Sequence, residues 1–363
     1  MMHHDDRLQR LRRILLLRRV SAFLVTGENN VRYLSGFSGD SGWILITPRR
    51  AFLITDFRYR EQAEKEAHPD FRVVESGNDY TAALKKICRS LKLRGMAFEG
   101  RHTSYLLYRK LKEELKGMKL TPGGGRVEEL RILKNEPELE AIRNSSALAV
   151  RALSEAISSL RRGMSEKDIA NLIVNAIRTE GGTRAFEPIV ASAGSSSQPH
   201  ALSSSRRIKE GEILLVDLGA KKDNYNSDLT RTFALSRYPP RFQKLYCLVL
   251  EAQSRALAAI SPGVRAADVD RAARGFLIEK GYGHRFGHAL GHGVGLEIHE
   301  EPRLSSASET ALEEGMVFTV EPGIYIPGWG GIRVEDTVRV TAEGYELLTP
   351  APKDLPSVLI KLR

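Results

Sequence analysis

The feature of this sequence that most constrains its fold is an internal repeat. The segment 163–181 opens and closes with Gly around a helical pattern, and the segment 263–281 repeats it one hundred residues later. Long helical patterns precede both segments, at 136–161 and 240–260, and strand-like apolar runs follow them. The two halves each read as two helices and then a pair of strands. They predict an α+β domain with a pseudo-twofold axis, one antiparallel sheet and helices packed on a face.

Each half carries a pair of carboxylates at matching positions. Asp217 follows the apolar run 213–216 and Glu321 follows the matching strand-like run 317–320, while Asp228 and Glu335 stand at the start of the next strand. A hairpin would bring the two acids of one half together, and the pseudo-twofold axis would bring both pairs to one point. Four buried carboxylates repel one another strongly unless cations neutralise them, so we expect a site for divalent ions.

Histidine is concentrated in the second half, where four of the nine histidines lie between residues 284 and 299. Interior glycines in this segment argue against a regular helix, since each costs about 1 kcal/mol relative to alanine. The spacing of His288 and His292 is therefore not the helical zinc signature. We expect an irregular or strand-like segment that holds imidazoles at the site, with glycines that allow close backbone approach.

Four carboxylates and one imidazole form an oxygen-rich ligand set. Such a set favours Mn or Co, with Fe or Zn as alternatives, over a thiolate-type zinc site. Enough ligands for two divalent ions predict a dinuclear hydrolytic centre in which a bridging hydroxide attacks a carbonyl. The sequence contains neither a G-x-S-x-G nucleophile motif nor a G-x-x-x-x-G-K-[ST] phosphate loop.

The first third of the chain has a different pattern, in which strands alternate with helices and predict an α/β layer domain. The breaker cluster TPGGG at 121–125 marks its end. We therefore predict an N-terminal α/β domain over 1–125 and the repeat domain over 126–363. The expected elements are a helix to Arg19, strands near 22–26, 43–47, 51–55 and 96–99, and helices near 58–67, 80–91 and 104–115.

The net charge of +10 raises the question of nucleic-acid binding. Residues 1–130 hold 25 Lys and Arg against 16 Asp and Glu, so the excess is scattered over predicted helices of the first domain. A nucleic-acid surface would set basic runs beside stacking aromatics, and no apolar run approaches the ~20 residues of a membrane span. We expect neither partner. Cys88 and Cys247 have no disulfide-framework or metal-site spacing, which favours the cytoplasm.

The residues and motifs resemble those of the pita-bread metallopeptidases. The order Asp217, Asp228, His292, Glu321, Glu335 is similar to the five metal ligands of that family. Four motifs narrow the resemblance to its proline-directed branch, the Xaa-Pro aminopeptidases and Xaa-Pro dipeptidases (prolidases). They are HALGHGVGLEIHE at 288–300, EPGIYIPGWGGIRVED at 321–336, VDLGAKKDNYNSDLTRTF at 216–233 and FEPIVASAGSSSQPHA at 186–201. Residues 1–125, with YLSGFSGDSG at 33–42, resemble the creatinase-type N-terminal domain.

The resemblance implies a role for each metal ligand. Asp217 would bind one ion, Asp228 and Glu335 would bridge both, and His292 and Glu321 would complete the shell of the other.

The resemblance also implies four catalytic residues around the metals. His200 matches a histidine that steadies the substrate or its oxyanion, and His299 one that contacts the scissile amide and passes protons. His288 matches a histidine near the substrate pocket, and Arg333 an arginine that contacts substrate or orients the site. For His288 and Arg333 a purely supporting role is the alternative.

The implied activity is cleavage between an N-terminal residue and a following proline, in dipeptides or longer peptides, by a cytoplasmic homodimer. Asp40, in a Gly-rich loop, is expected to reach the neighbouring site of that dimer. Three alternatives stay open: a methionine aminopeptidase, a metal-free creatinase-like C–N hydrolase, and a non-catalytic binding module on the same fold. The sequence does not separate dipeptidase from aminopeptidase.

Overall fold

The computed structural model describes residues 4–77 and 79–363. The chain divides into two compact units, Met1–Arg131 and Ile132–Arg363. The predicted boundary at 125 lies slightly before this division because α6 (Arg126–Arg131) packs on α1 (His4–Leu17) and α2 (Glu28–Ser35) of the first unit.

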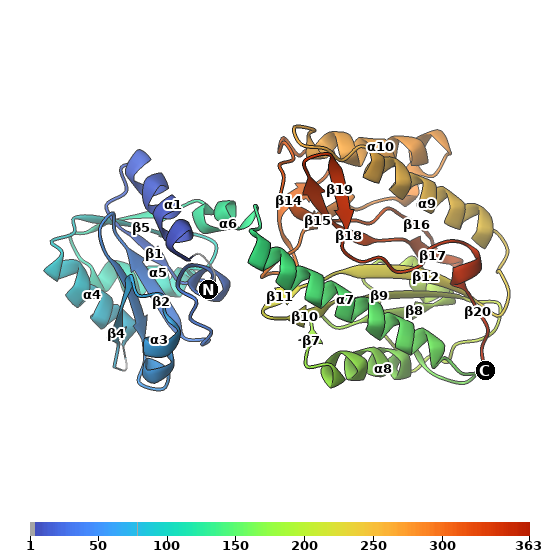
Figure 1. The fold of residues 1–363 in the computed structure, drawn as a ribbon, viewed down its shortest axis with the longest axis horizontal. Helices are drawn as coiled ribbons and strands as arrows, with labels where there is room; N and C mark the ends of the chain where they lie inside the picture. Colours follow the sequence, from blue (N-terminus) through green and yellow to red (C-terminus); the bar gives the residue numbers. More distant parts are fainter. Residues whose placement is uncertain (1–3, 78) are drawn as a thin grey trace. The chain divides into compact units, whose positions relative to one another are not determined.

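The first unit is built on a mixed six-stranded sheet with the strand order β4-β3-β2-β1-β5-β6 (Figure 1). β1, β2 and β3 pair antiparallel, and the outer strands add in parallel. The strands are β1 (Phe23–Val25), β2 (Gly42–Ile46), β3 (Ala51–Thr55), β4 (Phe71–Glu75), β5 (Gly95–Glu99) and β6 (Lys119–Gly123).

Helices complete this unit as an α/β layer structure. α3 (Arg60–Glu66) packs on β4, while α4 (Tyr80–Ser90) and α5 (Tyr105–Glu114) share an apolar core with one face of the sheet. The predicted ranges for α3, α4, α5 and strands β1, β2, β3 and β5 agree with the observed bounds to within two residues.

Four elements of this unit escaped prediction: α2, α6, β4 and β6. The TPGGG cluster was interpreted as a breaker, yet Pro122 and Gly123 lie in β6, at the edge of the sheet. An edge strand needs only one ladder of hydrogen bonds, so a proline, which lacks an N–H, is tolerated there.

The second unit contains the repeat. Its first half has α7 (Glu136–Ser158) and α8 (Glu166–Thr179), and its second half has α9 (Phe242–Ala258) and α10 (Ala266–Glu279). Figure 1 shows α7 and α8 beside the strands of the first half, and α9 and α10 beside those of the second. Three pairs of glycines at matching positions have positive φ, which confirms the repeat in the backbone: 163 with 263, 181 with 281, and 211 with 315.

The strands of the two halves form two principal sheets that meet at the isolated bridge between Thr230 and Glu335. One sheet has the order β20-β12-β9-β8 and the other β14-β13-β15-β18-β19. The expected single sheet is therefore divided, because only one bridge joins β12 to the segment before β18. The strands are β7 (Thr183–Arg184), β8 (Ile189–Ser192), β9 (Ile213–Leu218), β10 (Ala220–Lys222), β11 (Tyr225–Asn226), β12 (Leu229–Leu235), β13 (Gly291–Gly293), β14 (Glu300–Leu304), β15 (Val317–Val320), β16 (Gly323–Ile326), β17 (Gly330–Arg333), β18 (Asp336–Thr341), β19 (Gly344–Leu347) and β20 (Leu359–Ile360).

One apolar core, drawn from all four helices and both principal sheets, holds these strands in place. Within the described part of the chain, no helix combines the length and apolarity needed to cross a bilayer.

Candidate metal centre

Two carboxylates of the first half lie on neighbouring strands. Asp217 is in β9, in register with Thr230 of β12, and Asp228 directly precedes β12. Every residue of both strands is buried, and Asp217 and Asp228 are only 8% and 5% exposed. A carboxylate buried this deeply needs a partner or a cation, so these two acids mark a site rather than a surface.

The second half supplies two more carboxylates and the imidazole. Glu321 follows β15, Glu335 precedes β18, and these two strands pair antiparallel. His292 lies in β13, whose Gly293 pairs with β15. The backbone N–H of His292 donates to Thr319 Oγ1 (3.1 Å), and that hydroxyl donates to Glu321 Oε1 (3.2 Å). Thr319 therefore sets the position of both groups.

The glycines that flank His292 allow the close approach that the sequence predicted. A Cβ at Gly291 would lie 1.8 Å from Thr319 O, and one at Gly293 would lie 2.2 Å from Glu301 O. Real side chains do not tolerate such distances, so only glycine lets β13 sit between its neighbours and present His292 at the site.

The imidazole faces the acids of both halves. His292 Nε2 lies 3.6 Å from Asp228 Oδ2 and 3.5 Å from Glu321 Oε1. Its Nδ1 donates to Gly293 O (3.1 Å), which leaves the lone pair of Nε2 directed at the carboxylates. Asp228, His292 and Glu335 each offer a ligand atom within 4.8 Å of the others. The side chains of the two halves thus converge as the repeat predicted.

Asp217 stands at the edge of this group, against a buried arginine. Arg333 Nη2 donates to Asp217 Oδ2 (2.6 Å), while Asp217 Oδ1 is buried and has no hydrogen-bond partner among the described residues. Arg333 Nε donates to Thr230 Oγ1 (3.0 Å), and this hydroxyl donates to Glu335 Oε2 (2.5 Å). The orphaned oxygen is a free ligand position in an otherwise satisfied network.

The raised pKa values of the four acids show that their ionised forms need positive charge nearby. Burial, followed by repulsion from neighbouring carboxylates, raises the pKa of Asp228 and Glu335 well above ordinary values. Burial also raises the pKa of Asp217, although Arg333 opposes it, and raises the pKa of Glu321 to about 7. The four acids cannot all ionise without a nearby positive charge. The site also offers an imidazole with a free lone pair and an unpartnered carboxylate oxygen. These are the ligands that a divalent cation needs.

His288 lies beside the acids and is held on both ring nitrogens. Nδ1 donates to Ala289 O (2.8 Å), so Nε2 accepts from the hydroxyl of Tyr325 (3.0 Å). The ring packs edge-on against Phe286. Burial lowers the pKa of His288 to about 4, which keeps the imidazole neutral at neutral pH.

The other two predicted histidines are solvent-accessible. The His299 ring centroid lies 4.2 Å from that of His292, and His299 lines a cavity of about 510 Å³. Burial still lowers the pKa of His299. His200 is exposed on the turn before β9, near enough to act electrostatically on Asp217 and on His299. The structure therefore brings all nine predicted residues to one region.

Sequence reasoning missed the groups that hold these residues. Thr230 could have been found, because it lies two residues after Asp228 and strand alternation puts the two on one face. Tyr325, which donates to His288 and accepts from Arg333 Nη1 (2.9 Å), gave no signal apart from its motif. Asp270 of α10 also gave no signal in the sequence. It is fully buried and accepts a hydrogen bond from the backbone N–H of Leu290 (3.1 Å).

A second group with metal-ligand chemistry lies in the first unit: Glu99, His102 and Glu128. The amide of Asn30 donates to both glutamates, at 2.6 and 2.9 Å, and so lies between them. Two backbone N–H groups at the start of α2 donate to Glu99, and His102 contacts Glu128 at 2.8 Å. These bonds describe a structural network that fixes α2.

Comparison with known proteins agrees with this geometry. Residues 140–342 match the family described as "Metallopeptidase family M24", and residues 7–133 match the "Creatinase/Prolidase N-terminal domain". A protein from Pyrococcus horikoshii named "Xaa-Pro dipeptidase" is 35% identical over 93% of this chain and 94% of its own length.

Solved structures are similar over the full length. A structure described as "Xaa-Pro dipeptidase from Bacillus anthracis" has a TM-score of 0.95 at 38% identity, covering 99% of this chain and 100% of that one. A Thermotoga maritima structure described as an X-Pro aminopeptidase has a TM-score of 0.88, also at 38% identity, covering 96% and 100%. These matches confirm the predicted fold, and the chain belongs to the M24, or pita-bread, metallopeptidases as a metal-dependent peptidase with a creatinase-type N-terminal domain.

Proposed function

We propose that this metallopeptidase hydrolyses the bond between an N-terminal residue and a following proline, using two divalent ions. The observation that carries the proposal is the convergence of acids from two pseudo-symmetric halves on one imidazole, with Asp217 Oδ1 left without a partner. The proposed ligands are Asp217, Asp228, His292, Glu321 and Glu335.

The ligand atoms divide between two ions in this proposal. Asp217 would hold one ion, Asp228 and Glu335 would be shared by both, and His292 and Glu321 would hold the other. When bound, two divalent ions would supply Lewis acidity, which lowers the pKa of water and polarises a carbonyl oxygen. Mn or Co suits the oxygen-rich set best, with Zn or Fe as alternatives.

Three histidines around the acids supply proton transfer and orientation. His299, at the cavity and with a lowered pKa, is free to accept a proton and return it to the leaving nitrogen. His288 Nε2 is bonded to Tyr325, which places it to orient substrate rather than to act as a base. His200 steadies the developing oxyanion, and Arg333 holds Asp217 in position.

The choice of proline rests on bond chemistry and on the relatives. An Xaa-Pro bond is a tertiary amide with no N–H, so a groove that requires that hydrogen bond does not use it. A site of metal ions and imidazoles makes no such demand. The relatives named Xaa-Pro dipeptidase and X-Pro aminopeptidase support this substrate class and leave the length of the peptide open.

We further propose a cytoplasmic homodimer. Cys88 and Cys247 are both free, in keeping with a reducing compartment. Asp40 is exposed on the loop before β2, where it would reach a neighbouring subunit. A sedimentation mass of one chain alone would contradict the dimer.

A single assay tests the proposed function. Metal-loaded enzyme is given Gly-Pro, Gly-Pro-Ala, Gly-Ala and Met-Ala-Ser, with Mn, Co and Zn in turn. We expect turnover of a proline substrate well above that of the matched Gly-Ala control. Cleavage of Gly-Pro alone identifies a dipeptidase, and cleavage of Gly-Pro-Ala an aminopeptidase. Faster cleavage of Met-Ala-Ser than of both proline substrates would contradict the proposal in favour of a methionine aminopeptidase.

A further inference from the structure

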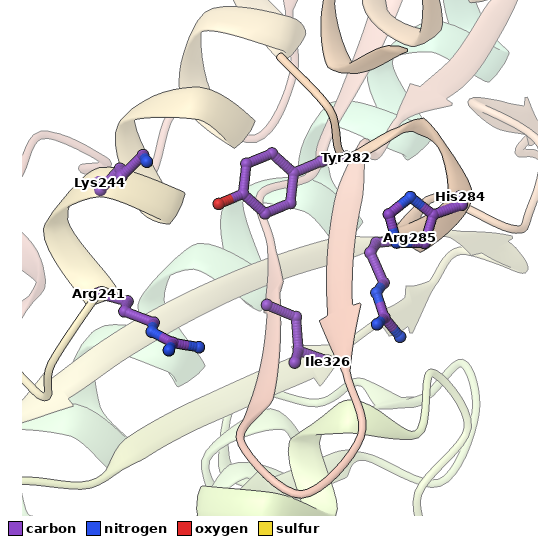
Figure 2. A pocket seen from close by; sticks show the side chains of 6 residues that line it. All are labelled: Arg241, Lys244, Tyr282, His284, Arg285 and Ile326. Atoms are coloured by element: carbon purple, nitrogen blue, oxygen red, sulfur yellow. The ribbon is translucent and has the colours of Figure 1, made fainter.

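A basic pocket lies outside the metal centre, between the start of α9 and the turn that follows α10. It is a cavity of about 300 Å³ lined by Arg241, Lys244, Tyr282, His284, Arg285 and Ile326. Figure 2 shows Arg241 and Lys244 on one side, His284 and Arg285 on the other, and Tyr282 and Ile326 between them. None of these residues is a proposed ligand or catalytic group. The pocket is also distinct from the cavity lined by His299.

The charge in this pocket is not neutralised. Its lining contains no acid, and three of its side chains, Arg241, Lys244 and Arg285, are cations. Within residues 4–77 and 79–363, none of these three side chains has a hydrogen bond or an ion pair with a carboxylate. Three cations line one cavity without a counter-ion, and their mutual repulsion means that the pocket gains free energy from a bound anion.

Nearby cations outside the pocket are already paired. Arg274 is bonded to Asp270 (2.7 Å), and Lys280 to Glu279 (2.8 Å). The charges of Arg274 and Lys280 are therefore neutralised locally and do not extend the positive charge of the pocket along α10. This arrangement suits a compact anion rather than a nucleic acid or another extended polyanion, which needs a stripe of basic residues.

The geometry favours a dianion with several acceptor oxygens. Two guanidinium groups and an ammonium offer more donors than one carboxylate can use, whereas a phosphoryl group has three or four oxygens for them. Tyr282 adds a hydroxyl and a ring face, and Ile326 an apolar contact. The first turn of α9 has no side-chain cap, and the dipole of this helix adds to the positive potential at its start.

We infer that this pocket is a binding site for a phosphoryl group, either inorganic phosphate or the phosphate of a small metabolite. The inference stands apart from the proposed peptidase activity, because no lining residue belongs to the metal centre.

Calorimetric titration of the metal-loaded protein tests the site. Inorganic phosphate and ribose 5-phosphate are titrated into the wild type, Arg285→Gln and Lys244→Gln/Arg285→Gln. The matched control is Arg178→Gln, which removes an exposed arginine from the last turn of α8 in the other half. Metal loading is checked to be equal in all four proteins, because a dinuclear centre can itself take phosphate.

We expect at least a tenfold weaker affinity in the double variant, an intermediate loss in Arg285→Gln and no change in Arg178→Gln. Tighter binding of ribose 5-phosphate than of inorganic phosphate would identify the ligand as a phosphorylated metabolite. Equal affinity for the two would identify it as inorganic phosphate. Phosphate binding that is absent from the wild type, or unchanged in the double variant, would overturn the inference.

Discussion

Thr230 connects the two halves of the site through one hydroxyl group. That hydroxyl donates to Glu335 and accepts from Arg333, whose guanidinium in turn holds Asp217. Thr230 is fully buried, so solvent cannot replace these bonds. The position of two proposed ligands therefore depends on a residue that contacts no metal in the proposed centre.

Thr230→Val should weaken the site with little change in shape. Removing the hydroxyl leaves Glu335 Oε2 and Arg333 Nε without this partner, at a cost of about 1–3 kcal/mol. We expect lower metal affinity and a lower kcat, measured by metal titration and by Xaa-Pro turnover. Thr232→Val is the control, because its hydroxyl bonds the backbone N–H and carbonyl of Arg333 and, among the described residues, no proposed ligand. Equal metal affinity in the two variants would contradict the role of Thr230.

Asp228→Asn tests a ligand directly. The amide keeps the volume and removes the charge, so the variant should lose both bound metal and activity while remaining folded. Elemental analysis after purification, paired with an assay and a circular-dichroism spectrum, measures all three. Normal metal content with normal turnover would show that Asp228 is not a bridging ligand.

At the scale of elements, α10 holds the histidine segment. Asp270 pairs with Arg274 and accepts from the N–H of Leu290, while Arg274 donates to the carbonyls of Phe286 and His288. The Arg274 guanidinium also stacks on the Phe286 ring, 4.2 Å from its centroid. These contacts fix the backbone conformation of the irregular, glycine-containing segment that carries His288.

Arg274→Met should loosen that segment and leave the rest of the domain folded. We expect a fall in kcat larger than any change in metal affinity, because His288 loses its backbone support while the ligands keep theirs. Faster amide hydrogen exchange over residues 286–290 would accompany it. An exchange pattern like that of the wild type would argue that α10 does not position the segment.

At the scale of the whole catalytic unit, a buried ion pair joins the two halves behind the site. Arg231 of β12 and Asp336 of β18 are fully buried and lie 2.6 Å apart, and Lys353 adds a second bond to Asp336 (2.6 Å). Arg231 also donates to the carbonyl of Glu335. The metal ligands of the two halves are thus fixed on a common frame.

The stability of this frame should depend on pH in opposite ways with and without metal. Glu321 binds its proton more tightly in the folded metal-free state, with a pKa of about 7, than in the unfolded chain, where the ordinary value is 4.5. Its protonation therefore stabilises the metal-free fold fully below the ordinary value, and this stability is lost as the pH rises through about 7.

Metal binding replaces that proton, so the loaded protein should gain stability as pH rises over the same range. We expect the Tm of metal-free protein to fall between about pH 5 and 7.5, and the Tm of loaded protein to rise. Parallel curves for the two forms would contradict the assignment of Glu321 to the site.

Features of the fold and of the site could be predicted where the sequence pattern alone determines them. The sequence predicted the repeat, the four acids and the glycine-flanked His292. In each case the hydrophobic period, the position in the chain and the residue type indicate the same structure. β6 was missed because its proline and its one glycine, followed by two more glycines, resemble a turn. The edge position of the strand is what makes the proline tolerable. Asp270 was missed because a buried acid acquires its role from partners distant in sequence. Strand alternation places Thr230 on the same face as Asp228, but its bonds to Arg333 and Glu335 of the other half leave no signal in the sequence.

The most direct test of the account is a crystal structure of the Mn-loaded enzyme with anomalous difference density. The account predicts two peaks per chain, about 3.5–4 Å apart, between the acids of the two halves. Their ligands should be Asp217, Asp228, His292, Glu321 and Glu335. Density for ions elsewhere in the chain, with these five side chains turned away from it, would contradict the account.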